Sequence, residues 1–183
     1  MKKLILAAAV LCFFASCKDS TTTSTTDNSQ NKKNLENNKK VIKAIETGDA
    51  AVIDSLIASD AVDHQTPTGM DLKGPDSVRH MLKDMHNHMK DLKFDIIADA
   101  ANGDYIFTLS KFKGTCTDAS MGMPAGTKMD MTGVDVVKVK DGKMVEHWGF
   151  VDANEMMKNM KGMPPMDNMK MENKMAPKDS TKK

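Results

Sequence analysis

Apolar residues recur at the spacing of α-helices in the first half of the central region. This pattern predicts helices over 34–47, 50–57 and 76–92. Gly48 suits the end of the first helix, and Asp49 suits the N-cap of the second. The apolar stripes of the three helices consist of Leu35, Val41, Ile42, Ile45, Val52, Ile53, Leu56, Ile57, Val78, Met81, Leu82, Met85, Met89 and Leu92.

Strand patterns dominate the second half. Two β-rich runs flank Asn102-Gly103 within 92–116, and two more flank Asp141-Gly142 within 128–152. Both dipeptides are typical of tight hairpin turns. The remaining elements are an extended segment over 60–67 and a closing helix over 152–160. This order predicts an α+β domain, with helices packed on one face of a curved antiparallel sheet.

The N-terminus has the pattern of a bacterial export signal. Lys2 and Lys3 precede an apolar run over 4–14, which is too short to span a bilayer. The sequence "FASC" that follows resembles a lipobox, which implies removal of a signal peptide over 1–16 and lipidation of Cys17. Ordinary secretion with cleavage nearby is the alternative. The polar segment 17–33 is predicted to be a flexible, lipid-anchored tether.

Composition limits the remaining possibilities. Residues 34–160 have the length of one domain, and the Met- and Lys-rich segment 161–183 is predicted to be a disordered tail. After export and lipidation, Cys116 is the one thiol left, so no disulfide within the chain is expected. The formal net charge of +1 gives no reason to expect a nucleic-acid partner.

The central region resembles a known family. The segments "DHQTP", "GPDSVRHML", "GMPAGTKMDMTGVD" and above all "GVDVVKVKDGKMVEHWGFVD" look like the SnoaL-like polyketide (ester) cyclases, which belong to the nuclear transport factor 2-like superfamily. The resemblance covers roughly 34–160. It implies a cone-shaped α+β fold, with a curved antiparallel sheet wrapped on N-terminal helices.

The resemblance also implies where a site would lie. The acidic base of these cyclases falls on Gly149, which cannot accept a proton, and their second polar group falls on Asp135. Asp135 and His147 are therefore the candidate catalytic residues. The alignment with the family implies that both lie on the inside of the cone, and strand alternation then puts Glu146 and Trp148 on the opposite face. The predicted ligand pocket consists of Asp63, His64, Val137, Val145, Gly149 and Val151.

Three functions remain open on this basis. The first is a lipid-anchored module that binds a small apolar molecule in the cone, with Asp135 and His147 as structural or ligand-binding groups. The second is a cyclase or isomerase that abstracts a proton beside a carbonyl through Asp135 or His147. The third is a periplasmic Cu(I)- or Ag(I)-binding protein, because the chain contains 18 methionines and thioethers are soft ligands. Methionine as core filler or as an oxidant sink is the simpler explanation.

Location and partners follow from the same patterns. A lipidated Cys17 implies attachment to the bacterial outer membrane, facing the periplasm or the cell surface. Neither a cofactor nor a specific metal site in the folded domain is expected. The resemblance also suggests a homodimer formed through the sheet.

Overall fold

The computed structural model describes residues 25–65, 70–120 and 123–159. Its elements follow the predicted order of helix, helix, strand, helix, four strands and helix. They are α1 (Thr25–Thr47), α2 (Ala50–Leu56), β1 (Ile57–Asp63), α3 (Ser77–His88), β2 (Met89–Asn102), β3 (Tyr105–Cys116), β4 (Lys128–Lys140), β5 (Lys143–Val151) and α4 (Ala153–Asn159).

The five strands form one sheet in the order β1-β5-β4-β3-β2. Strands β2 to β5 form the predicted antiparallel meander, but β1 pairs with β5 in parallel. The sheet is therefore mixed: the curved antiparallel part is as expected, and the parallel edge strand β1 is added to it. No hairpin joins β1 to a neighbour, so its direction is set by the path of the chain out of α2.

The Asp141-Gly142 turn forms as predicted. Lys140 pairs with Lys143, and both turn residues have positive φ, 52° at Asp141 and 76° at Gly142. Two positive φ values are characteristic of the type I′ turn, whose twist matches that of the flanking strands. This turn sets the pairing of β4 and β5 next to it, and a β-bulge at Val145 then shifts the register by one residue. The shifted register determines which side chains of the site face one another.

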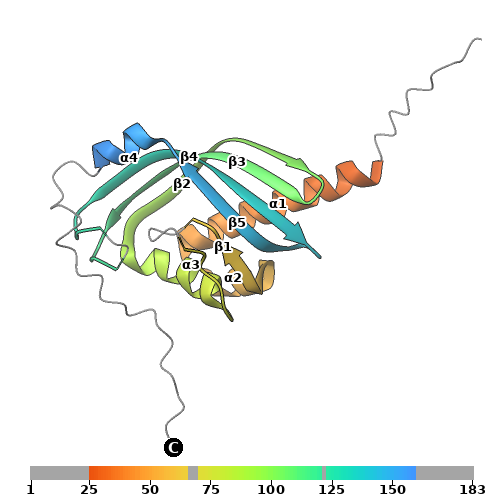
Figure 1. Ribbon diagram of the computed structural model, residues 1–183, viewed down its shortest axis with the longest axis horizontal. Coiled ribbons are helices and arrows are strands. Elements are labelled where there is room, and N and C mark those ends of the chain that lie inside the picture. The colour runs from red at the N-terminus through yellow and green to blue at the C-terminus, as the bar shows by residue number, and fades with distance from the viewer. Residues whose placement is uncertain (1–24, 66–69, 121–122, 160–183) are drawn as a thin grey trace, which may run out of the picture.

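Helices α1, α2 and α3 lie on one side of the curved sheet (Figure 1). The core between these layers is apolar, and Ile53, Ile57, Val78 and Ile106 are among its fully buried side chains. Asp49 caps α2 as predicted, because its carboxylate accepts from the backbone N–H groups of the first helical turn. The predicted α+β fold is thus confirmed.

The third helix is shorter than the sequence pattern suggested. It ends at His88, and Met89 already has extended dihedral angles and pairs with Cys116 on β3. Met89 and Leu92 are buried, but as residues of β2 rather than α3. Cross-strand hydrogen bonding to β3 thus prevails over the helical spacing of these residues.

Helix α1 extends into the segment that was predicted as a tether. It begins at Thr25 rather than near Asn34, which is only 3% exposed and accepts a hydrogen bond from the side chain of Gln30 at 2.8 Å. Once Asn34 and the next turns pack on the sheet, each preceding residue adds a helical hydrogen bond without a new nucleation cost. Among the helices that the structure describes, none is long and apolar enough to cross a membrane.

Candidate active site

A chain of three side chains occupies the inner face of the sheet. Nδ1 of His147 lies 3.1 Å from Oδ2 of Asp63, and Nε2 lies 3.3 Å from Oδ1 of Asp135. The three residues differ in exposure: the Asp63 side chain is 4% exposed, that of His147 18% and that of Asp135 34%. We call this arrangement the carboxylate–imidazole chain. It runs from a buried acid to an acid that solvent and ligands can reach.

Strand register explains why these residues meet. On parallel neighbours β1 and β5, Asp63 is the direct partner of His147. On antiparallel neighbours β4 and β5, His147 is opposite Val137 and Asp135 is opposite Gly149. Asp135 and His147 are therefore diagonal neighbours on one face. The two side chains thus share a face, as the resemblance implied, and the β-bulge at Val145 brings them there.

The environment favours the charged form of His147. Burial alone would lower the pKa of this imidazole, but hydrogen bonds to Asp135 and Asp63, together with their negative charges, raise it to about 9. At neutral pH His147 is thus an imidazolium between two carboxylates. Such an imidazolium holds the Asp135 carboxylate in place through Oδ1, and among the described residues the contact leaves the second oxygen available to a ligand.

Gly149 is covered by a side chain that the sequence analysis did not single out. A Cβ added at Gly149 would overlap the carboxamide of Gln65. The backbone N–H of Gln65 also donates to Oδ1 of Asp63 at 2.7 Å. Gln65 lies two residues after Asp63, so alternation along the strand was the signal that could have placed it on this face.

His64 is not part of the inner face, which corrects its assignment to the predicted pocket. Its ring stacks on Trp148 with a centroid distance of 4.7 Å, and Nδ1 lies 2.9 Å from Oδ1 of Asp71. The Asp71 hydrogen bond is the main cause that raises the pKa of His64, with a smaller contribution from Glu146. Because consecutive strand residues alternate, Asp63 and His64 necessarily point to opposite faces.

The surroundings of Asp135 are more polar than predicted. On its β3 side the direct partner is Thr108, which is 1% exposed and accepts a hydrogen bond from Nδ2 of Asn38 at 3.0 Å. On its β5 side the partner is Gly149. Buried hydroxyl groups at Thr108 and Ser110 thus replace the expected valine wall beside this acid. Asn38 and Thr108 are further residues that the sequence analysis missed.

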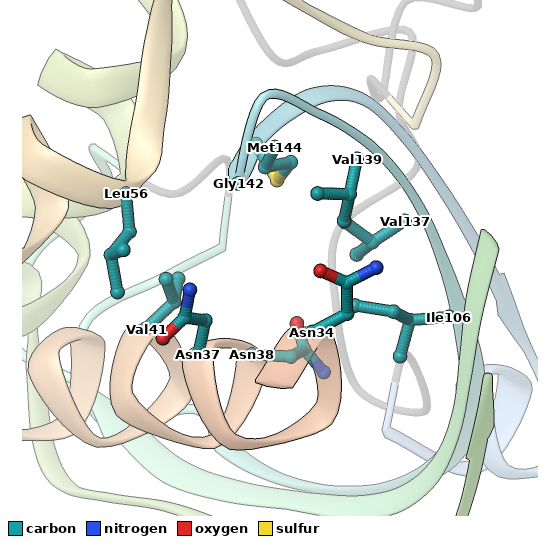
Figure 2. A pocket seen from close by; sticks show the side chains of 10 residues that line it. All are labelled: Asn34, Asn37, Asn38, Val41, Leu56, Ile106, Val137, Val139, Gly142 and Met144. Atoms are coloured by element: carbon teal, nitrogen blue, oxygen red, sulfur yellow. The ribbon is translucent and has the colours of Figure 1, made fainter. Parts of the chain in front are cut away.

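The predicted pocket valines fall in different places. Val137 is 6% exposed and belongs to the core, Val145 sits at a β-bulge between two ladder pairs, and Val151 is 38% exposed at the end of β5. Figure 2 shows a cavity between α1 and the β4–β5 hairpin, and Val137 is part of its wall. The cavity has a volume of about 20 Å³, which is about the room for one water molecule. Its lining residues are Asn34, Asn37, Asn38, Val41, Leu56, Ile106, Val137, Val139, Gly142 and Met144.

Comparison with known proteins identifies the family. The sequence profile of the family described as SnoaL-like polyketide cyclase matches residues 37–160. The chain belongs to the SnoaL-like polyketide cyclase family. The comparison with curated proteins gave no match.

Solved structures agree with this family and with its nuclear transport factor 2-like fold. A proposed SnoaL-like polyketide cyclase from Jannaschia sp. CCS1 shares 15% identity at a TM-score of 0.61, over 73% of this chain and 95% of its own. IdmH from Streptomyces antibioticus, a proposed polyketide cyclase, shares 25% identity at a TM-score of 0.56, over 70% of this chain and 98% of its own. An epoxide hydrolase of the LEH-like type from M. tuberculosis shares 14% identity at a TM-score of 0.59, over 72% of this chain and 92% of its own.

Within the part of the chain that the structure describes, no group of three His, Cys, Asp or Glu side chains could hold a metal ion. The Met-rich segment 161–183 lies outside the described residues, as do the predicted signal peptide and Cys17. Binding of Cu(I) or Ag(I) by that segment stays a prediction. Cys116 is buried, and burial raises the pKa of its thiol.

Proposed function

We propose that this SnoaL-like domain catalyses proton abstraction beside a carbonyl group, in a cyclisation or an isomerisation of a small carbonyl compound. Asp135 is the base. The observation that carries the proposal is the carboxylate–imidazole chain, in which a buried acid orients an imidazole that in turn holds a partly exposed acid. The two acids accept from both N–H groups of the imidazolium, and the partly exposed one, Asp135, is held where a carboxylate could also act on a ligand.

Each member of the chain has a distinct role in this proposal. The free oxygen of the Asp135 carboxylate takes the proton from the carbon next to the carbonyl. His147 is a positioning residue, because as an imidazolium it fixes and charge-stabilises Asp135. Asp63 fixes the orientation and protonation of His147 from its buried position. The acid that the family carries at the Gly149 position is thus replaced by an acid on the facing strand.

Proton abstraction can be measured without knowing the natural substrate. In D₂O, wild-type protein is expected to accelerate deuterium uptake next to the carbonyl of α-tetralone, followed by NMR. Asp135→Asn removes the proton-accepting carboxylate and is expected to lower that rate by about a hundredfold or more. Asp71→Asn, which changes an acid on the opposite face, is the matched control and should retain the rate.

Ligand binding without chemistry is the second candidate function. It is favoured by Gly149, which lacks the acid of the family. The same preparations distinguish the two candidates: if 1-naphthol binds by fluorescence titration but wild type and Asp135→Asn exchange deuterium equally slowly, the domain is a binding module and the catalytic proposal is wrong.

We also propose that the protein is anchored to the outer membrane through Cys17. The support is the sequence "FASC" after an apolar run, together with the membrane affinity of multiple acyl chains. Cys17→Ser is expected to abolish metabolic labelling with a fatty acid and to release the protein from membrane fractions. Equal labelling of both proteins would contradict the anchor.

A homodimer through the outer face of the sheet is a further proposal from the resemblance. Phe107, Val136 and Trp148 form one cross-strand row there, and Phe107 and Phe150 are 43% and 60% exposed. Phe150→Glu is expected to convert the dimer to a monomer in light scattering. A wild-type monomer at micromolar concentration would contradict this proposal.

A further inference from the structure

Gln65 occupies the space that a side chain at position 149 would need. The overlap of a Cβ at Gly149 involves the end of the Gln65 side chain, with its Oε1, Cδ and Nε2 atoms. Glycine at position 149 therefore has an effect beyond the absence of the acid that the family carries there. It makes room for a carboxamide on the inner face of the sheet.

Two contacts hold Gln65 beside the carboxylate–imidazole chain. Its backbone N–H donates to Asp63, the same carboxylate whose other oxygen contacts His147. Its carboxamide lies over Gly149, the direct cross-strand partner of Asp135. Directly opposed residues of antiparallel strands have Cβ atoms about 4.5–5.5 Å apart. The carboxamide, at the position of the missing Cβ, thus lies about that far from the Cβ of Asp135.

The separation between the Gln65 carboxamide and Asp135 suits a carbonyl compound that loses a proton, because two closely spaced atoms of that compound take part in the step. The carbonyl oxygen and the carbon that loses the proton are attached to the same carbonyl carbon. The Gln65 carboxamide, which lies over β5, and the Asp135 carboxylate on β4 can therefore contact the carbonyl oxygen and the carbon, respectively. Gln65 is exposed to solvent, so a ligand can reach its carboxamide, which carries two N–H donors.

We propose that Gln65 is a substrate-binding residue that donates a hydrogen bond to the carbonyl oxygen of the substrate. This inference rests on the proposed role of Asp135 as base. When the C–H bond breaks, its proton goes to the Asp135 carboxylate and its electron pair forms the C=C bond of the enolate. The carbonyl π electrons move to the oxygen, where the Gln65 N–H group stabilises the negative charge. Return of a proton from Asp135 or from solvent to carbon completes the exchange.

The first experiment measures binding alone. The probe is 1-naphthol, the aromatic counterpart of the α-tetralone enol, titrated by its fluorescence against full-length protein. Gln65→Leu keeps the size of the side chain but removes the donor, and it is expected to raise the Kd about five- to tenfold. Gln30→Leu is the matched control: Gln30 donates to Asn34 on α1, not to the site, so that variant should keep the wild-type Kd.

The second experiment tests the link between Gly149 and Gln65. Gly149→Ala places a methyl group where the carboxamide lies and should weaken naphthol binding to the same extent as Gln65→Leu. The double variant should show no additional loss, because each change removes the same contact. Additive losses, or a Gln65→Leu Kd within twofold of wild type, would overturn the assignment. Circular dichroism melts confirm that each variant is folded.

Deuterium exchange separates this inference from the proposed function. If the Asp135 proposal holds, Gln65→Leu should lower the exchange rate of bound α-tetralone by about a hundredfold, beyond its effect on KM. If wild type gives no exchange but Gln65→Leu still weakens naphthol binding, the catalytic proposal fails while the binding role of Gln65 stands. Unchanged exchange and unchanged binding in Gln65→Leu would refute the inference even with an active wild type.

Discussion

Nδ1 of His147 lies 3.1 Å from a carboxylate oxygen of Asp63, and the two residues are direct partners on parallel strands β5 and β1. The Asp63 side chain is only 4% exposed. A buried carboxylate is costly unless it is paired and hydrogen-bonded. His147 and the backbone N–H of Gln65 provide those partners, so the ionised state of His147 and the stability of the domain are linked.

The pH dependence of stability follows from this linkage. The pKa of His147 is raised from 6.5 in the unfolded chain to about 9 in the folded protein. The ion pairing of His147 therefore contributes fully to the free energy of unfolding below its unfolded pKa of 6.5. This contribution is lost as the pH rises through its folded pKa of about 9. A shift of this size corresponds to about 3 kcal/mol of unfolding free energy. Urea denaturation from pH 6 to pH 10 should show that loss in wild type and not in His147→Gln; parallel curves for the two proteins would contradict it.

Asp63→Asn should be strongly destabilising. It leaves the His147 imidazole with one carboxylate instead of two and removes the charge that pairs with it in a buried position. The expected loss of unfolding free energy is about 3 kcal/mol, accompanied by a lower pKa of His147 in NMR titration. Asp71→Asn is the matched control, because Asp71 contacts His64 with a side chain that is 44% exposed, and it should cost less than about 1 kcal/mol. Similar losses in both variants would argue against the linkage.

A partly buried hydrogen bond between Asn38 and Thr108 should link α1 to the sheet. Thr108→Val keeps the shape of the side chain but leaves Nδ2 of Asn38 without its acceptor, which should cost about 1–2 kcal/mol. Replacing both partners, as Asn38→Leu with Thr108→Val, should recover part of that loss, because no orphaned donor remains. Chemical denaturation of the two single variants and the double variant measures the coupling; strictly additive losses would show that the bond contributes nothing.

Arg79 should stabilise the junction between α2 and β1. Its guanidinium donates to the carbonyl oxygens of Asp54 and Ile57 and contacts the carboxylate of Asp76 at 2.7 Å. Arg79→Ala should lower the unfolding free energy by about 2–3 kcal/mol, because several partners lose charge-assisted bonds. Arg79→Lys should restore little of the lost unfolding free energy, because a single ammonium group cannot reproduce the planar set of donors of a guanidinium. Lys83→Ala, which breaks an ion pair with Asp54 on the surface, provides the control; equal melting temperatures for Arg79→Ala and Lys83→Ala would be the contrary result.

Features set by neighbouring residues could be predicted from the sequence. Helical spacing, the Asp49 cap and the Asp141-Gly142 turn act over a few residues, so their signals are local. The register at this turn does not by itself bring Asp135 and His147 to one face: the β-bulge at Val145 shifts the pairing of β4 and β5 by one residue and places them together. The order of elements, and with it the α+β class, followed from these local patterns. The end of α3 did not, because Met89 and Leu92 fit a helix and a strand equally well.

Features that depend on distant strands required the tertiary structure. The parallel pairing of β1 with β5 joins Asp63 to His147 across a separation in sequence that no periodicity encodes. The same pairing turns His64 to the outer face and brings Gln65 over Gly149. Sequence alone thus determined which polar residues the strands carry and which of them alternate together. Only the pairing of β1 with β5, and the bulged pairing of β4 with β5, decided which of them touch, because contact depends on the register between strands.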